Sequence, residues 1–160
     1  MEVIKYNYEP ELKNEFIELN KAWIIRDYVL EDEDIKVFNT IDEKVKNGSI
    51  IYFVKNENII VSTLMLEKLS NTKYELIKFA TKEGYYNLGA GSFLLDYVIK
   101  DIANCAKEIV IATNKKCIAA IHLYEKYGFK KTNLLQYGFS SNRVDICYKL
   151  ELGGIYDKWK

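Results

Sequence analysis

The sequence predicts an α/β fold with a mixed sheet, in which helices flank a central β-sheet of parallel and antiparallel strands. Two observations support this fold class. Strand-like and helix-like segments alternate on both sides of a glycine-rich turn at residues 85–91, and such units connect parallel strands through a helix. Ahead of that turn, two strand-like segments are joined by the short polar connection Asn56-Glu57-Asn58, which is typical of an antiparallel hairpin.

The first half of the chain is predicted to form two helices and three strands. A helix is expected after Pro10, which a first helical turn tolerates, because apolar residues then recur every three or four positions: Leu12, Phe16, Leu19 and Trp23. A short second helix is expected at 42–47, closed by Gly48. β-Branched and aromatic residues then predict strands at 49–55, 58–67 and 73–81.

The second half continues the alternation. A helix is expected at 92–106, with one apolar face made of Leu95, Val98, Ile99, Ile102 and Ala106. The β-branched segment 108–113 predicts a buried strand. Another helix is expected to begin near Thr113 or Asn114 and to end at Gly128, and the alternating segment 143–152 predicts a final strand.

The composition indicates one soluble domain, which we place at residues 1–152, followed by a short tail at 153–160. Lys and Arg together number 23, as do Asp and Glu, so no basic excess favours nucleic acid or a membrane as a partner. The sequence has neither a long apolar run nor the apolar core of a signal peptide, so we expect a cytoplasmic protein, as a monomer or homodimer.

Cysteine and histidine usage argues against a metal centre. The three cysteines, Cys105, Cys117 and Cys147, have no metal-binding spacing, and we expect reduced, mostly buried thiols. His122 is the single histidine, so a histidine-based metal site is not expected. It lies two residues before Tyr124, which on a helix directs the two side chains apart, and a surface position is expected.

The glycine-rich turn has the local features of an anion-binding site. Backbone N–H groups at a helix N-terminus lack intrahelical partners and lie at the positive end of the helix dipole. Gly89 and Gly91 allow a phosphate to approach that backbone closely. The turn lacks the GK[ST] of a P-loop, and Leu94 stands where a Rossmann turn has glycine or alanine. A tight packing turn is the alternative.

Two segments carry a resemblance to a known family. Residues 86–91, Tyr-Asn-Leu-Gly-Ala-Gly, are similar to the acetyl-CoA motif Q/R-x-x-G-x-G/A of the GNAT superfamily of N-acetyltransferases, with Tyr86 in place of Gln or Arg. Residues 113–131, TNKKCIAAIHLYEKYGFKK, resemble the later family motif, an Asn followed by A-x-x-L-Y-E-K-x-G-F. The resemblance implies the GNAT acyl-CoA N-acyltransferase fold and direct transfer, in a ternary complex, of an acetyl group from acetyl-CoA to a primary amine.

The resemblance also implies which residues hold coenzyme A. Its pyrophosphate is expected on the backbone N–H groups of seven consecutive residues: Tyr86, Asn87, Leu88, Gly89, Ala90, Gly91 and Ser92. Its pantetheine arm is expected between two strands that splay apart, often at a bulge. The arm would pair there with the backbone of Phe79, Ala80 and Thr81, while Asn114 approaches from the neighbouring strand.

Two residues are candidates for the chemistry. Tyr124, the Tyr of the L-Y-E-K run, is expected to hydrogen-bond or protonate the leaving thiolate, with core packing as the alternative. Glu75 lies six residues before Thr81, which is the offset of the general base in the histone-acetylating branch. Its apolar neighbours predict a raised pKa. Regular pairing would place it on the same face as Phe79, whereas a bulge would shift that phase. A structural carboxylate, with no dedicated base, is the alternative.

Recognition of the acceptor is expected from the first helices and their loop, with Trp23, Arg26 and Tyr28 as candidate contacts. The acids of residues 30–34, LEDED, either attract a cationic amine or simply begin a solvated helix. Arg143 and Asp145 are equally open between acceptor contacts and an edge-strand pair. The acceptor is expected to be a small-molecule or peptide amine. A non-catalytic acyl-CoA-binding or interaction module of the same fold is the alternative function.

Overall fold

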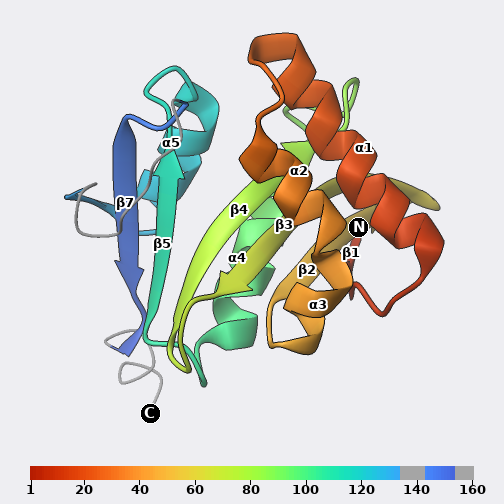
Figure 1. Ribbon diagram of the computed structural model, residues 1–160. Coiled ribbons are helices and arrows are strands. Elements are labelled where there is room, and N and C mark those ends of the chain that lie inside the picture. Colours follow the sequence, from red (N-terminus) through yellow and green to blue (C-terminus); the bar gives the residue numbers. More distant parts are fainter. Residues whose placement is uncertain (134–142, 154–160) are drawn as a thin grey trace.

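The computed structural model describes residues 1–133 and 143–153. Of the predicted tail at 153–160, all but Gly153 lies outside the described residues. Within them, the chain forms a seven-stranded mixed sheet in the order β1-β2-β3-β4-β5-β7-β6 (Figure 1). The strands are β1 (Glu2–Lys5), β2 (Ile50–Asn56), β3 (Ile59–Lys68), β4 (Lys73–Thr81), β5 (Glu108–Thr113), β6 (Lys130–Thr132) and β7 (Ile146–Glu151).

Helices cover both faces of this sheet, as the sequence predicts. They are α1 (Pro10–Asp27), α2 (Asp32–Asn39), α3 (Ile41–Lys46), α4 (Ala90–Ile102) and α5 (Ile118–Lys126). Helices α1 to α3 pack on one face and bury Phe16, Ile24 and Phe38 against β2 and β3. Helices α4 and α5 pack on the other face, where a second core contains Leu94, Leu95 and Tyr124.

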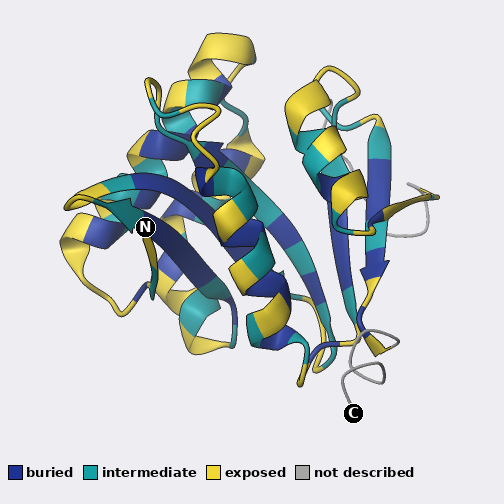
Figure 2. Ribbon diagram, turned by 180° about the vertical axis from the view of Figure 1, so that it is seen from behind, coloured by how far each residue is buried: buried dark blue, intermediate teal, exposed yellow. Residues whose placement is uncertain are grey.

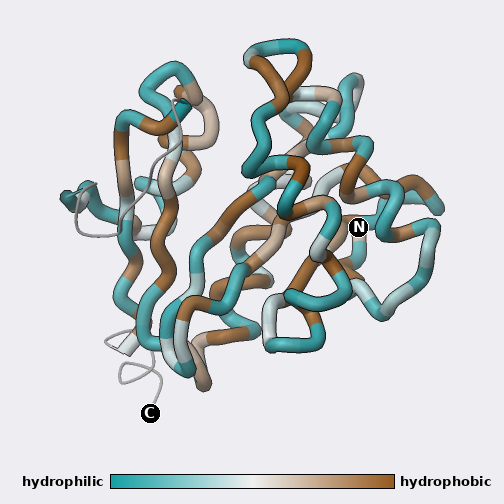
Figure 3. The backbone as a smooth tube through the Cα atoms, viewed as in Figure 1, coloured by the Kyte–Doolittle hydropathy of each residue, from teal (hydrophilic) through white to brown (hydrophobic). Residues whose placement is uncertain are grey.

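The predicted apolar face of the helix at 92–106 is confirmed. Leu95, Val98, Ile99 and Ile102 lie on α4 and are buried. Ala106, expected on the same helix, is buried but lies beyond the end of α4 at Ile102. Figure 2, seen from behind the view of Figure 1, shows buried and exposed positions alternating along this helix. The hydropathy of the chain follows the same division, since brown, hydrophobic stretches run along the strands (Figure 3). Amphipathic periodicity is therefore sufficient to orient this helix.

Three elements differ from the prediction. Helix α5 begins at Ile118, after Cys117, rather than near Thr113 or Asn114. Strand β1 has only four residues and pairs antiparallel with β2 at the sheet edge, so its sequence pattern is too short to detect. Helix α2 occupies the segment that begins in the acidic run. Its first turn is closed by a capping box between Glu31 and Asp34. Because α2 has eight residues, it shows no long apolar period.

The sheet splays apart between β4 and β5. These parallel strands pair only from Lys73 to Glu75, against Glu108 to Val110. Beyond this point the two strands diverge (Figure 1). β4 continues to pair with β3, through Thr81, and β5 continues to pair with β7, through Thr113. The sheet is thus divided into two halves that are joined at one end of the β4–β5 pair.

A bulge interrupts β4 within the splayed region. The register shifts so that Met65 pairs with Ile77 while Thr63 pairs with Ala80, and Lys78 has a left-handed φ of 55°. An extra residue changes the phase of the strand. Glu75 therefore faces the α1–α3 side, whereas Phe79 packs into the core beneath α4 and α5. Regular pairing, which would place Glu75 and Phe79 on one face, therefore does not hold in β4, and the bulge shifts the phase.

The cysteines are free thiols, but Cys105 is exposed and Cys117 is half-buried, so the expectation of mostly buried thiols holds only for Cys147. His122 is exposed, as predicted. In the described part of the chain, no helix combines the length and the apolar character needed to span a membrane.

Candidate active site

The glycine-rich turn opens helix α4. Gly89 is the residue before the helix and adopts φ 84°, a conformation that favours glycine. A Cβ atom built on Gly89 meets no atom within 4 Å, so the protein leaves open space in front of this backbone. Tyr86 and Leu88 are exposed, with 42% and 61% of their surface accessible. The exposed turn at a helix N-terminus fits the pyrophosphate of coenzyme A.

The free edge of β4 lies next to this turn. Phe79, Ala80 and Thr81 follow the bulge, and β3 pairs with Ala80 and Thr81 on one side only. Within residues 1–133 and 143–153, the β5 side of the same segment has no strand pairing, because the β4–β5 ladder stops at Glu75. Backbone groups of an unpaired edge can bind an extended amide-containing chain, and a pantetheine arm is such a chain.

Tyr124 lies on the α4–α5 side of the splay. It is 4% exposed, and its ring lies 6.4 Å from that of Phe79, 5.7 Å from Phe129 and 6.5 Å from Tyr148. Burial, with a smaller contribution from Cys117, raises the pKa of the Tyr124 hydroxyl above its ordinary value. The hydroxyl therefore stays protonated at neutral pH and can donate a hydrogen bond.

Asn114 directly follows β5 and organises the loop there. Its side-chain Nδ2 donates to the backbone oxygen of Arg143 at 3.0 Å, and its Oδ1 accepts from the backbone N–H of Lys116 at 2.9 Å. Asp145 was a candidate either for an acceptor contact or for an edge-strand pair with Arg143. In the structure its side chain accepts a hydrogen bond from the backbone N–H of Lys115 at 2.8 Å. These contacts fix the shape of the β5 end of the gap.

A hollow of about 380 Å³ opens on the α1–α3 side of the splay. Side chains from α1, α2, β3, β4 and the end of β5 line it, including the predicted Glu75, Asn114, Trp23 and Tyr28. Among the described residues, those lining it include four carboxylates and two cations: Glu33, Asp34, Glu67, Glu75, Lys78 and Arg143. The charged side chains that line the hollow are thus mixed, with carboxylates in the majority.

Glu75 has the electrostatic environment of a base. The pKa of Glu75 rises to about 7, mainly because the carboxyl group is buried. The negative charge of the neighbouring Glu67 raises it further. Lys78 and Lys44 act in the opposite direction but more weakly. The raised pKa agrees with the sequence prediction. Glu67 was not predicted, because only the β3–β4 register reveals that it lies opposite Glu75.

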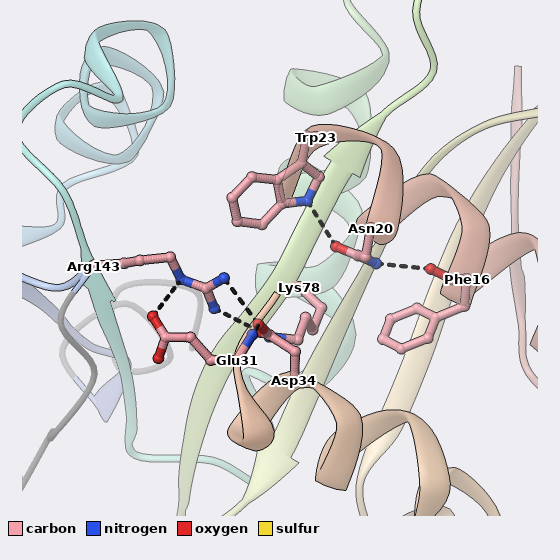
Figure 4. Close-up of polar contacts among 7 residues, drawn as sticks. All are labelled: Phe16, Asn20, Trp23, Glu31, Asp34, Lys78 and Arg143. Carbon is pink, nitrogen blue, oxygen red and sulfur yellow. Dashed lines mark hydrogen bonds and ion pairs between the residues drawn. The ribbon is translucent and has the colours of Figure 1, made fainter. Parts of the chain in front are cut away.

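A buried charged cluster borders the hollow (Figure 4). Asp34 is fully buried and accepts from Lys78 Nζ at 2.6 Å and from Arg143 Nη1 and Nη2 at 2.9 and 2.6 Å. The acidic run was expected to be either an acceptor site or a solvated helix start. For Asp34 neither holds, since its carboxylate is occupied by two cations of the protein itself.

The three candidate acceptor residues separate in the structure. Trp23 and Tyr28 line the hollow and pack edge to face, with ring centroids 6.2 Å apart. Arg26 is not among the residues that line it. Its guanidinium pairs with Asp27 and donates to the hydroxyl of Tyr86 at 2.7 Å, so it lies beside the glycine-rich turn. Of the three, Arg26 is thus the one that lies away from the hollow.

The splayed sheet, with a glycine-rich turn at one side and an acidic hollow at the other, defines an acyl-CoA-dependent acyltransferase fold. The sequence model of the Acetyltransferase (GNAT) family matches residues 13–129. The chain belongs to this family of acetyltransferases, for which acetyl-CoA is the acyl donor. No curated protein matches the chain.

Solved structures share the fold. An acetyltransferase of the GNAT family from Staphylococcus aureus Mu50 superimposes with a TM-score of 0.80 at 24% identity, covering 94% of this chain and 99% of that one. A GNAT acetyltransferase from Elizabethkingia anophelis with acetyl-CoA bound gives 0.67 at 21% identity, covering 94% and 97%. An aminoglycoside 6'-N-acetyltransferase complexed with coenzyme A gives 0.72 at 16% identity, covering 95% and 97%.

Proposed function

We propose that this protein transfers the acetyl group of acetyl-CoA to a primary amine, directly and within a ternary complex. The observation that carries the proposal is the gap between β4 and β5. The glycine-rich turn lies beside one end of it, and a hollow containing Glu75 lies on one of its faces. A thioester in this gap would be accessible to an amine in the hollow and to a side chain from the opposite face.

Acetyl-CoA supplies an activated acyl group, and the residues of the chain place it. The backbone N–H groups from Tyr86 to Ser92 hold the pyrophosphate, and the free edge at Phe79, Ala80 and Thr81 pairs with the pantetheine arm. Asn114 borders the same gap from the end of β5. Gly89 fits this arrangement because the space in front of its backbone is open.

Glu75 and Tyr124 divide the proton chemistry between the two faces of the sheet. The amine must be neutral to attack, and a carboxylate with a pKa of about 7 can accept its proton, directly or through water. The new C–N bond forms as the C–S bond breaks. The charge that develops on sulfur is stabilised by the protonated hydroxyl of Tyr124.

The acceptor is an amine that is cationic in solution. The hollow has more carboxylates than cations, and two of the carboxylates, Glu67 and Glu75, lie side by side in the sheet. The aromatic rings of Trp23 and Tyr28, which line the hollow, provide apolar contacts for the remainder of such a molecule.

A screen of primary amines tests the proposal by following release of the free thiol of coenzyme A. The panel contains polyamines, amino-terminal peptides and aminoglycosides, the last because one similar structure is of an aminoglycoside 6'-N-acetyltransferase. We expect amine-dependent thiol release and a product heavier by one acetyl group. Tight acetyl-CoA binding without transfer to any amine would instead favour the non-catalytic acyl-CoA-binding module.

A further inference from the structure

We propose that Arg143 is a positioning residue that braces the two halves of the splayed sheet and sets the width of the gap between β4 and β5. The inference rests on the proposed function, because the gap is where the pantetheine arm is proposed to bind. It assigns to Arg143 a role in cofactor affinity that is separate from the glycine-rich turn and from the acid–base residues.

The strands themselves leave the gap width undetermined. β4 and β5 pair only as far as Glu75 and Val110, and β5 continues to Thr113. Three further residues at about 3.3 Å each leave roughly 10 Å of β5 without a β4 partner. Some other contact must therefore fix the separation of the strands at the height of the β4 bulge.

One end of the brace is attached to β5. The side chain of Asn114, the residue that follows β5, donates to the backbone oxygen of Arg143 at 3.0 Å. The backbone N–H of Asp145 donates to the backbone oxygen of Thr113 at 3.0 Å. The backbone of Arg143 is thus held at the end of β5, within the half of the sheet that contains β5 and β7.

The other end reaches the opposite half. The guanidinium of Arg143 donates two hydrogen bonds to Asp34, and its Nε lies 3.6 Å from Glu31 Oε1, so both contacts are with α2 and its cap (Figure 4). Asp34 in turn accepts from Lys78, which is the left-handed residue of the β4 bulge. A continuous path of polar contacts therefore runs from the end of β5 to the bulge of β4.

The path is buried and well oriented. The side chains of Asp34, Lys78 and Arg143 are 0%, 10% and 15% exposed. Burial opposes ionisation of Asp34, but the hydrogen bonds from Arg143 and Lys78 outweigh it and lower its pKa to about 2. Breaking such a buried pair leaves a charge without compensation, so the contact strongly favours one separation of the two halves.

Aromatic side chains hold the guanidinium in place. Its carbon lies 5.9 Å from the ring centroids of both Trp23 and Tyr28. Trp23 is itself fixed, because its indole N–H donates to Asn20 at 2.9 Å and Asn20 donates to the backbone oxygen of Phe16 at 2.9 Å (Figure 4). The guanidinium of Arg143 therefore packs against a Trp23 side chain that is itself held in place on α1.

The test compares two ligands in the variant Arg143→Gln by calorimetry. Coenzyme A contains the pantetheine arm, whereas adenosine 3'-phosphate 5'-diphosphate contains the nucleotide and the pyrophosphate without the arm. We expect coenzyme A to bind about 10-fold more weakly to Arg143→Gln, equivalent to about 1.4 kcal/mol, and the armless nucleotide to bind as it does to the wild type. Arg143→Lys keeps the positive charge but lacks the planar guanidinium group. Its affinity for coenzyme A is expected to lie between those of the wild type and Arg143→Gln.

A matched control is Lys100→Gln, which removes an exposed ion pair with Asp96 and should leave both affinities unchanged. Unchanged coenzyme A affinity in folded Arg143→Gln, or equal weakening of both ligands, would overturn the brace. If Arg143→Gln does not fold, Arg143→Lys decides by the same comparison. A wild type that binds neither ligand would contradict the proposed function instead, so the two failures are distinguishable.

Discussion

Glu75 lies directly opposite Glu67 in the antiparallel pairing of β3 and β4, and both carboxylates line the same hollow. The pair is asymmetric, since Glu67 forms an ion pair with Lys44 at 3.3 Å. Burial and the negative charge of Glu67 make ionisation of Glu75 costly and raise its pKa from 4.5 to about 7. Two consequences of this relationship can be measured.

The first concerns activity. If Glu75 accepts the proton of the amine, kcat/KM should rise with pH and level off above a midpoint near 7, where the carboxylate is ionised. Glu75→Gln should lower kcat by about 10²- to 10⁴-fold and remove this midpoint. Glu67→Gln should move the midpoint below that of the wild type, because one cause of the raised pKa is lost. Full activity in Glu75→Gln would show that catalysis uses no dedicated base.

The second concerns stability. The folded-state pKa of Glu75 is above its ordinary value, so between pH 4.5 and 7 the folded protein keeps a proton that the unfolded chain releases. The free energy of unfolding should therefore fall as pH rises through this range. Urea titrations of wild type and Glu75→Gln across this range should show that the wild type loses stability relative to the variant up to about pH 7. A constant difference would contradict the raised pKa.

Tyr124→Phe tests the proposed contact with sulfur. The variant keeps the ring, whose neighbours are Phe79, Phe129 and Tyr148, and removes only the hydroxyl. If the hydroxyl acts on the leaving thiolate, kcat should fall by about 10²- to 10⁴-fold while the dissociation constant of acetyl-CoA changes little. Stability should change by no more than about 1 kcal/mol.

Tyr148→Phe is the matched control for that experiment, because it alters a ring in the same aromatic cluster. Single-turnover transfer to the best amine, measured beside calorimetric binding, separates the two roles. Equal kcat in wild type and Tyr124→Phe would identify Tyr124 as a packing residue.

Gly89→Val tests the glycine-rich turn. A side chain there would project into the open space in front of the backbone, where the pyrophosphate is proposed to bind. We expect acetyl-CoA binding to be lost while the protein remains folded, because a non-glycine residue at φ 84° costs only about 1–3 kcal/mol. Gly84→Val is the control, since Gly84 has φ 90° and equally open surroundings but precedes the turn. If Gly89→Val binds acetyl-CoA as tightly as Gly84→Val and the wild type do, measured by calorimetry, the turn serves packing alone.

Local pattern was sufficient for much of the structure. The strands at 73–81 and 108–113 occur with the predicted bounds, and the apolar face of the helix after the glycine-rich turn is the predicted one. These features depend on residues close together in the chain, namely period-2 or period-3.6 patterns and glycine at a helix start. The first family motif falls at the turn, and the second runs from the end of β5 through α5 into β6. Together they predict the cofactor and the candidate residues Asn114, just after β5, and Tyr124, on α5.

Only the tertiary structure decided how the site is assembled. The bulge at Lys78 places Glu75 and Phe79 on opposite faces of the sheet. The side chain of Arg26 donates to Tyr86, 60 residues away in the sequence, at the glycine-rich turn. Asp34 became a buried partner of Lys78 and Arg143, which are 44 and 109 residues distant. A buried carboxylate is stable only when cations surround it, and those cations come from other elements. By itself, the sequence determined most of the longer elements and the family, while the packing of distant segments determined which charges are buried and which line the hollow.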